Sequence, residues 1–137
     1  MAGMARAMAR WMRAKTLEEL QVYQHSIDAA AAISAIVNRP GLRRDIELRD
    51  QLDRSSSRVP PLISEGFGQG TDRHFASYLY RARGSCNEVR THLTIARNKK
   101  YIDATECAEH AERYVAIGKM LTRLIQHLRQ ENRKWRG

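Results

Sequence analysis

The sequence predicts an all-α protein, folded as an up-down-up-down antiparallel four-helix bundle. Three observations support this fold class. Apolar residues recur at alternating steps of three and four over four segments of the 137-residue chain, the period of helices with one buried face. Short runs of turn-forming residues separate the segments, so consecutive helices should lie antiparallel. No segment shows the strict alternation of a half-buried strand.

The first helix is predicted to begin at Thr16, because Thr16 and Glu19 have the spacing of a capping box. It should end at the sequence NRPG. Its inward row is expected to be Leu20, Tyr23, Ile27, Ala30, Ser34 and Val37.

The second helix is expected from about Leu42, and it contains two adjacent prolines. Pro60 and Pro61 have no amide hydrogens for the carbonyls of Ser56 and Ser57, so the helix should kink or be locally rebuilt there. The serine hydroxyls and water can satisfy the groups left over. The inward row is predicted to be Leu48, Leu52, Ser55, Val59, Leu62 and Gly66.

The sequence GFGQG follows at residues 66–70. No strand precedes it and no Lys-Ser or Lys-Thr pair follows it, so it is not a nucleotide-binding loop of the usual kind. We expect Gly66, Gly68 and Gly70 instead to end the second helix and to lead into a third that begins near Thr71.

The third and fourth helices have the most regular patterns of the chain. An Asp103/Glu106 capping box should start the fourth helix. The inward row of the third is predicted to be Phe75, Leu79, Ala82, Cys86, Val89, Leu93 and Ala96. That of the fourth is predicted to be Cys107, Ala111, Tyr114, Gly118, Leu121, Ile125 and Leu128. Residues 16–130 thus form the bundle, with a basic N-terminal arm at 1–15 and a basic C-terminal tail at 131–137.

The chain carries a net charge of +9, and most of its 24 basic residues are arginine. Arginine suits phosphate groups because its planar fork donates two hydrogen bonds at once. Nucleic acid, RNA or DNA, is therefore the expected partner class. The alternative is that the charge only keeps a small interaction scaffold soluble.

An up-down-up-down bundle brings the start of the first helix, the loop at 66–70 and the end of the fourth helix to one pole. Trp135 lies among basic residues of the tail, a mixture that suits single-stranded nucleic acid; a solvated terminus is the other interpretation. The predicted nucleic-acid-binding residues are Arg6, Arg10, Arg13, Lys15, Arg73, His74, Arg123, Arg129, Arg133, Lys134, Trp135 and Arg136.

No catalytic, cofactor or metal site is expected. His92 and His110 fall at nearly the same level of the predicted hairpin. A two-histidine metal site is therefore the alternative to simple helix-surface pairs with Glu88 and Glu106.

Cys86 and Cys107 should be free core thiols, because about eight residues of helix rise separate them. Two unpaired cysteines suggest a reducing, cytoplasmic location. The apolar segment 29–37 is too short to span a membrane, so we expect no membrane partner.

Two sequences, RSSSRVPPLISEGFGQG and FASYLYRARGSCNEVRTHL, carry a resemblance that extends over roughly residues 20–128. They resemble the bacterial four-helix-bundle proteins encoded in intervening sequences of large-subunit ribosomal RNA genes, a family similar to the accessory variability proteins of diversity-generating retroelements. The resemblance implies a homo-oligomer, often of five subunits, without catalytic activity. The retroelement members look like partners of a reverse transcriptase and its RNA, so the resemblance suggests these as partners. The family usually has arginine where Gln69 stands.

Gly84 independently suggests assembly. By its register it faces away from its own core, where glycine costs about 1 kcal/mol relative to alanine in a helix. Such a position makes sense if another backbone approaches closely. Gly84 and Ser85 are therefore the predicted oligomer interface, and simple tolerance of glycine is the alternative.

Overall fold

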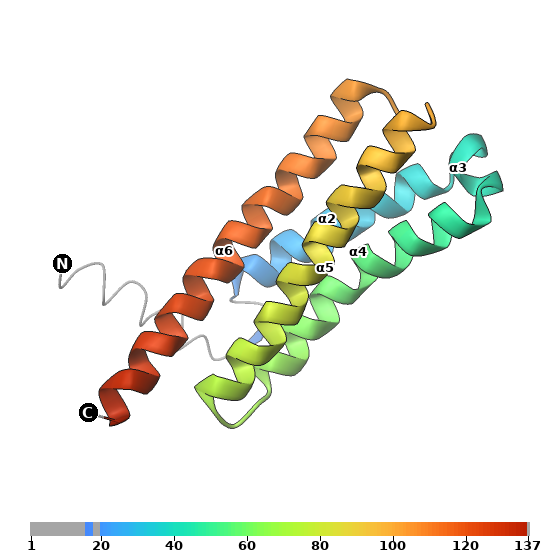
Figure 1. Cartoon of the computed structure of the whole chain (residues 1–137). Coiled ribbons are helices and arrows are strands. Elements are labelled where there is room, and N and C mark those ends of the chain that lie inside the picture. The colour runs from blue at the N-terminus through green and yellow to red at the C-terminus, as the bar shows by residue number, and fades with distance from the viewer. Residues whose placement is uncertain (1–15, 18–19, 137) are drawn as a thin grey trace.

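The computed structural model describes the backbone of residues 16, 17 and 20–136, and the side chains of this set up to residue 130. It confirms the all-α antiparallel bundle (Figure 1). Helix α5 contacts α4 and α6, and α2 closes the bundle by contacting the same two helices. The helices are α2 (Gln21–Val37), α3 (Pro40–Arg44), α4 (Ile46–Phe67), α5 (Asp72–Asn98) and α6 (Ala104–Arg136). The backbone of the segment that we treated as a tail is thus helical as far as Arg136.

The expected inward row of the first helix is correct at its two ends, where Leu20 and Val37 are buried, and is wrong by one residue between them. Helix α2 begins at Gln21, and Leu20 occupies the N-cap position without a side-chain cap. Ile27, predicted to point inward, is 40% exposed. A shift of one residue turns a helix by about 100°, and in the second half of the helix it buries Ile33 and Ile36 where the predicted row has Ser34. The buried residues of α2 are Val22, Ser26, Ala29, Ile33, Ile36 and Val37.

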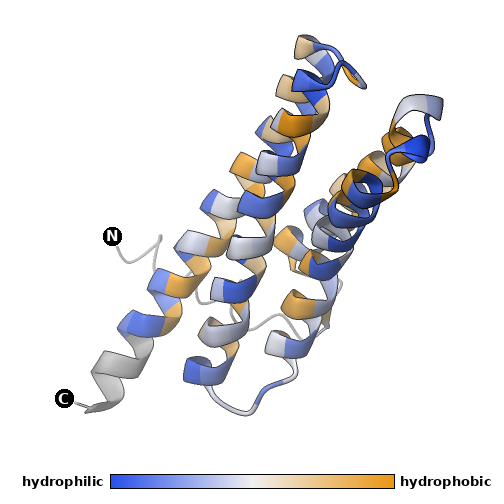
Figure 2. Ribbon diagram, turned by 45° about the vertical axis from the view of Figure 1, so that its right-hand side comes forward, coloured by the Kyte–Doolittle hydropathy of each residue, from blue (hydrophilic) through white to orange (hydrophobic). Residues whose placement is uncertain are grey.

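The predicted rows of the other three long helices are confirmed almost throughout. Every residue expected to face inward on α4 and α5 is buried. On α6 only Ala111 and Gly118 are partly exposed, and the rest of the row is buried. Figure 2 shows the apolar residues gathered on the faces that the helices turn toward one another.

The predicted second helix is divided at Asp45, so it does not run from Leu42 without a break. The Asp45 carboxylate caps α4 by accepting a hydrogen bond from the Leu48 amide at 3.3 Å. It also accepts from Lys99 Nζ at 2.8 Å and from the Tyr101 hydroxyl at 2.9 Å. One carboxylate therefore starts α4 and ties it to the turn between α5 and α6.

The two prolines do not interrupt α4, whose helical backbone continues through them to Phe67. They lie in the last turns of the helix, where few further bonds depend on them. We expected serine hydroxyls to donate hydrogen bonds to the carbonyls that the prolines leave free, but those of Ser55 and Ser56 donate elsewhere. Ser55 and Ser56 donate to the Leu52 carbonyl at 3.3 and 2.9 Å, one turn toward the N-terminus.

The glycines do end the second helix, but without the left-handed conformation that favours glycine. Gly68 occupies the C-cap with φ −79°, and among the described residues no glycine has a positive φ. Thr71 then caps α5, its Oγ1 accepting from the His74 amide at 3.2 Å. Over the described part of the chain, no helix combines the length and apolar character needed to cross a membrane.

Candidate nucleic-acid interface

The start of α2, the α4–α5 loop and the end of α6 lie at one end of the bundle, which we call the basic pole (Figure 1). Here Arg73, in the first turn of α5, and Arg129, near the end of α6, line one shallow groove together with Tyr80. Arg129 Nη1 donates to the Tyr80 hydroxyl at 3.1 Å. His74 is exposed on the same turn as Arg73. The structure thus brings three predicted residues to one pole.

The remaining predicted binding residues divide into two groups. Arg123 is exposed on α6 but lines a different groove, nearer the middle of the bundle. The others lie outside the residues whose side chains the structure describes: Arg6, Arg10, Arg13, Lys15, Arg133, Lys134, Trp135 and Arg136.

The second groove runs between α5 and α6, and we call it the seam groove. Its rims carry four cationic side chains, and none of its lining residues is acidic. Its volume is about 370 Å³. The lining residues are Arg83, Asn87, Arg90, Tyr114, Val115, Gly118, Lys119, Thr122 and Arg123.

The sequence analysis missed most of the seam groove, although a signal was present. Arg83 and Arg90 are one heptad apart, and each directly follows a core position of α5. Lys119 and Arg123 have the spacing of one turn on α6. Basic residues that flank the apolar rows of two adjacent helices converge on the seam between them.

Arg83 is held in place by two contacts. Its Nη1 donates to Thr122 Oγ1 at 3.1 Å, and its guanidinium lies 5.0 Å from the centre of the Tyr80 ring. Thr122 in turn donates to the Gly118 carbonyl at 2.9 Å. These contacts join the seam groove to Tyr80 at the basic pole.

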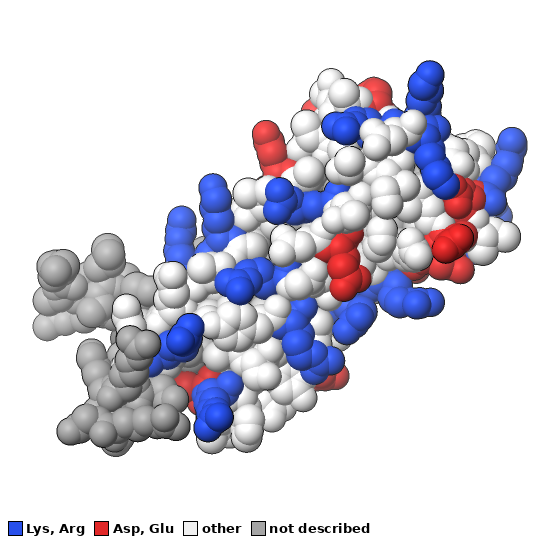
Figure 3. All heavy atoms as spheres, in the orientation of Figure 1, with Lys and Arg blue, Asp and Glu red and all other residues white. Residues whose placement is uncertain are grey.

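The cations of the α5/α6 face form no ion pair with a described carboxylate, although Asp72 lines the basic-pole groove next to Arg73. Among the described residues, the ion pairs are Arg39 with Glu106, Arg49 with Asp50, and Lys99 with Asp45. None of these involves the seam groove or the basic pole. In Figure 3, Lys and Arg side chains are spread over the face formed by α5 and α6, and Asp and Glu are sparser there.

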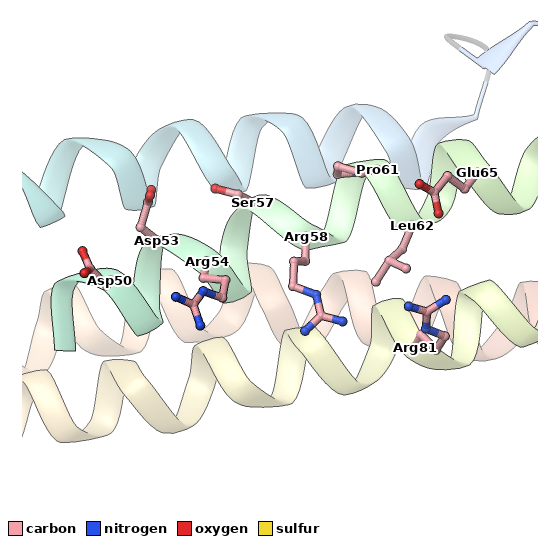
Figure 4. Close-up of a pocket in the computed structure, with 9 residues that line it drawn as sticks. All are labelled: Asp50, Asp53, Arg54, Ser57, Arg58, Pro61, Leu62, Glu65 and Arg81. Carbon is pink, nitrogen blue, oxygen red and sulfur yellow. The ribbon is translucent and has the colours of Figure 1, made fainter. Parts of the chain in front are cut away.

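A third groove, between α4 and α5, differs in its charge. Arg54 and Arg58 of α4 and Arg81 of α5 point toward the gap between the two helices (Figure 4). The same groove is lined by three carboxylates, so its formal charges cancel. They belong to Asp50, Asp53 and Glu65. An anionic polymer therefore gains less there than along the α5/α6 face.

Of the two residues predicted at an oligomer interface, only Gly84 is open to a second subunit. It is exposed, and a Cβ atom added to it would meet nothing within 4 Å. Ser85 is 2% exposed and faces its own bundle.

The histidines expected to lie at one level contact different neighbours. His92 Nδ1 lies 3.4 Å from Ser55 Oγ of α4. Burial, helped by Arg113, lowers the pKa of His110. Glu106, one turn before His110, is paired with Arg39.

Both cysteines are buried and free, as predicted. The Cys107 thiol lies 3.5 Å from the Leu93 carbonyl. This contact confirms the antiparallel register from which we inferred that the two sulfurs cannot bridge. Burial raises the pKa of the Cys86 thiol to about 12.

The fold and this surface define a basic, all-α four-helix-bundle protein. The chain belongs to the 23S rRNA-intervening sequence protein family, because residues 18–123 match the family model. It is also similar to a crystal structure of a protein of unknown function from the S23 ribosomal protein family of Bacteroides thetaiotaomicron. The TM-score is 0.70 at 21% sequence identity, with 76% of this chain and 97% of that chain covered. At this identity the likeness shows the fold alone. Among curated proteins, none matches the chain.

Proposed function

We propose that the protein is a non-enzymatic, homo-oligomeric nucleic-acid-binding accessory factor, which binds RNA or single-stranded nucleic acid through its basic pole. The observation that carries the proposal is the convergence of Arg73, Arg81 and Arg129 beside Tyr80 in a groove with one carboxylate, Asp72, which forms no ion pair with them. Three guanidinium groups next to an exposed aromatic ring combine charge with a stacking platform, as single-strand binding requires.

The first turn of α5 adds to this surface. The N-terminus of the helix carries partial positive charge, and exposed Arg73 and His74 lie on it. Many modest phosphate contacts of this kind give affinity with slight sequence preference. A reverse transcriptase bound to structured RNA is the partner that the family resemblance suggests, and five subunits is the assembly that it suggests.

The test is the salt dependence of binding to a labelled oligouridine of about 20 nucleotides. Removal of one cation that binds a phosphate should flatten the slope of log affinity against log salt by about 0.7 for a single strand. The test variant replaces four cations by glutamine, at Arg129, Arg133, Lys134 and Arg136. It should bind more weakly, with a slope flatter by up to about 2.8.

A matched control removes four cations from the opposite pole. It carries glutamine at Arg43, Arg44 and Arg97, and asparagine at Lys100, whose φ of 64° asparagine tolerates. The control should bind nearly as the parent does. The proposal is wrong if the quadruple variant keeps the parent's affinity and salt slope, or if the parent binds no nucleic acid. In either case the alternative function applies, that of a protein-interaction scaffold whose charge serves only solubility.

A further inference from the structure

We propose that the seam groove is a second phosphate-binding site, occupied by the same single strand that the basic pole binds. This inference rests on the proposed function and extends it, because it defines a track along the α5/α6 seam. The charge of the groove is the first argument. Arg83 and Arg90 form one rim and Lys119 and Arg123 the other, and no carboxylate lines the space between them. Four cations facing one concave surface create a strong local preference for an anion.

The second argument is Tyr114, which also lines the groove. Its side chain is 1% exposed, and its hydroxyl is the one buried side-chain oxygen or nitrogen without a hydrogen-bond partner among the described residues. Burial raises the pKa of this phenol, so the hydroxyl keeps its proton and remains a donor at neutral pH. A buried donor without a partner is costly, and a phosphate oxygen would relieve that cost once side chains of the groove moved enough to admit it to the buried hydroxyl.

The third argument is continuity between the groove and the basic pole. Arg83 lies over Tyr80, and Tyr80 accepts a hydrogen bond from Arg129. Along α6, the eleven steps from Gly118 to Arg129 correspond to about 16 Å of helix rise. A strand of several nucleotides spans that distance. Tyr80, 39% exposed, lines the basic-pole groove next to Arg83 of the seam groove, and its ring offers a surface for a base.

The occupant is a single strand rather than a duplex. Tyr80, partly exposed beside the groove, can stack on a base of a single strand, whereas the bases of a duplex are already stacked on one another. A free phosphate ion shares the same chemistry, and the experiment below distinguishes it from a strand.

The experiment compares the affinities of the full-length protein for labelled oligouridines of 4 and 12 nucleotides. In the parent, the longer strand should gain affinity by reaching from the basic pole into the seam groove. In the double variant Lys119→Gln/Arg123→Gln, the ratio of 12-mer affinity to 4-mer affinity should be smaller than in the parent by about five-fold or more. The salt slope for the 12-mer should be flatter by up to about 1.4. The pole variant Arg73→Gln/Arg129→Gln should instead weaken both lengths.

Tyr114→Phe removes only the hydroxyl and keeps the buried ring. It should weaken the 12-mer a few-fold without changing the salt slope, and it should raise the melting temperature of the free protein, because the unpartnered polar group is removed. Unchanged 12-mer affinity together with a lowered melting temperature would mean that the hydroxyl has a structural partner, and would overturn its assignment.

Three further outcomes separate the hypotheses. If the parent binds oligouridine but the Lys119/Arg123 variant keeps the full gain, the second site is wrong and the proposed function stands. If the parent binds neither strand, both fail. If inorganic phosphate below 1 mM displaces the 12-mer at constant ionic strength, the groove is a small-anion site and the strand assignment is wrong; no displacement supports the strand.

Discussion

Gly66 of α4 and Tyr78 of α5 approach so closely that a Cβ atom on Gly66 would lie 2.8 Å from the Tyr78 Cβ. It would also lie 3.0 Å from the Phe75 ring and 3.3 Å from the Phe75 carbonyl oxygen. The glycine therefore sets how near the two helices come beside the basic pole. It does so through the absence of a side chain, since its φ is not positive.

Gly66→Ala should lower the free energy of unfolding by about 1 to 3 kcal/mol, because neither the Tyr78 Cβ nor the Phe75 backbone can move aside freely. Urea denaturation measures the change. Gly70→Ala is the control, since a Cβ there meets nothing within 4 Å. Equal stabilities of the two variants would contradict the close approach.

Asp45 gives the stability a defined dependence on pH. Hydrogen bonds from Lys99 and Tyr101 lower the pKa of this carboxyl below 3.8, the value of a free aspartate. A group with a lowered pKa contributes stability that is fully present above the unfolded value and is lost as the pH falls through the folded value. The difference in melting temperature between the parent and Asp45→Asn should therefore shrink below about pH 3.8.

Two further variants separate the charge of Asp45 from its role as a cap. Asp45→Ala should melt below Asp45→Asn at pH 7, because asparagine still accepts from the Leu48 amide. Asp28→Asn, on the exposed face of α2, should leave the melting temperature almost unchanged. An alanine variant as stable as the asparagine variant would show that the cap contributes nothing.

A substitution at Gly84 tests the predicted homo-oligomer. Light scattering at micromolar concentration should give a mass several times 15.8 kDa for the parent. Gly84→Gln should reduce that mass, because a long side chain would prevent a close approach of subunits, while helicity is kept or improved. The control, Ala35→Gln, adds the same side chain to an exposed position of α2. A parent mass near 15.8 kDa would rule out the oligomer.

The two cysteines should both titrate as free thiols in denatured, unreduced protein. In the native protein at pH 8, Cys86 should react slowly with a disulfide reagent, because a pKa of about 12 leaves almost no thiolate. The variant Cys107→Ser isolates this reaction. Rapid labelling of the folded variant would show that Cys86 is accessible.

Trp135→Ala should weaken the binding of single-stranded oligonucleotides by about 1 to 3 kcal/mol if a base stacks on the indole. Binding to a duplex of equal charge should change little, because its bases are already stacked. Anisotropy titrations with both ligands measure the difference. An equal reduction for both would contradict the stacking role.

The sequence by itself determined the class of fold and the inner faces of α4, α5 and α6. On those helices one apolar row is clearly larger than any other, so the buried face follows from local pattern alone. Helix α2 has two adjacent rows of similar quality, and only packing against α4 and α6 decided that Ile33 rather than Ile27 is buried. The hydrogen bonds from Lys99 and Tyr101 to Asp45 were equally hidden, because both donors are more than fifty residues away in the chain.

The basic pole could be predicted from connectivity, since short loops fix which helix ends meet. The seam groove could not, because it depends on how the flanks of α5 and α6 face each other after their cores have packed. Only in that arrangement does Arg83 reach Thr122, and only there is the Tyr114 hydroxyl left without a hydrogen-bond partner. Local sequence determines which face of a helix is apolar, whereas tertiary packing decides which polar groups are brought together and which are left without partners.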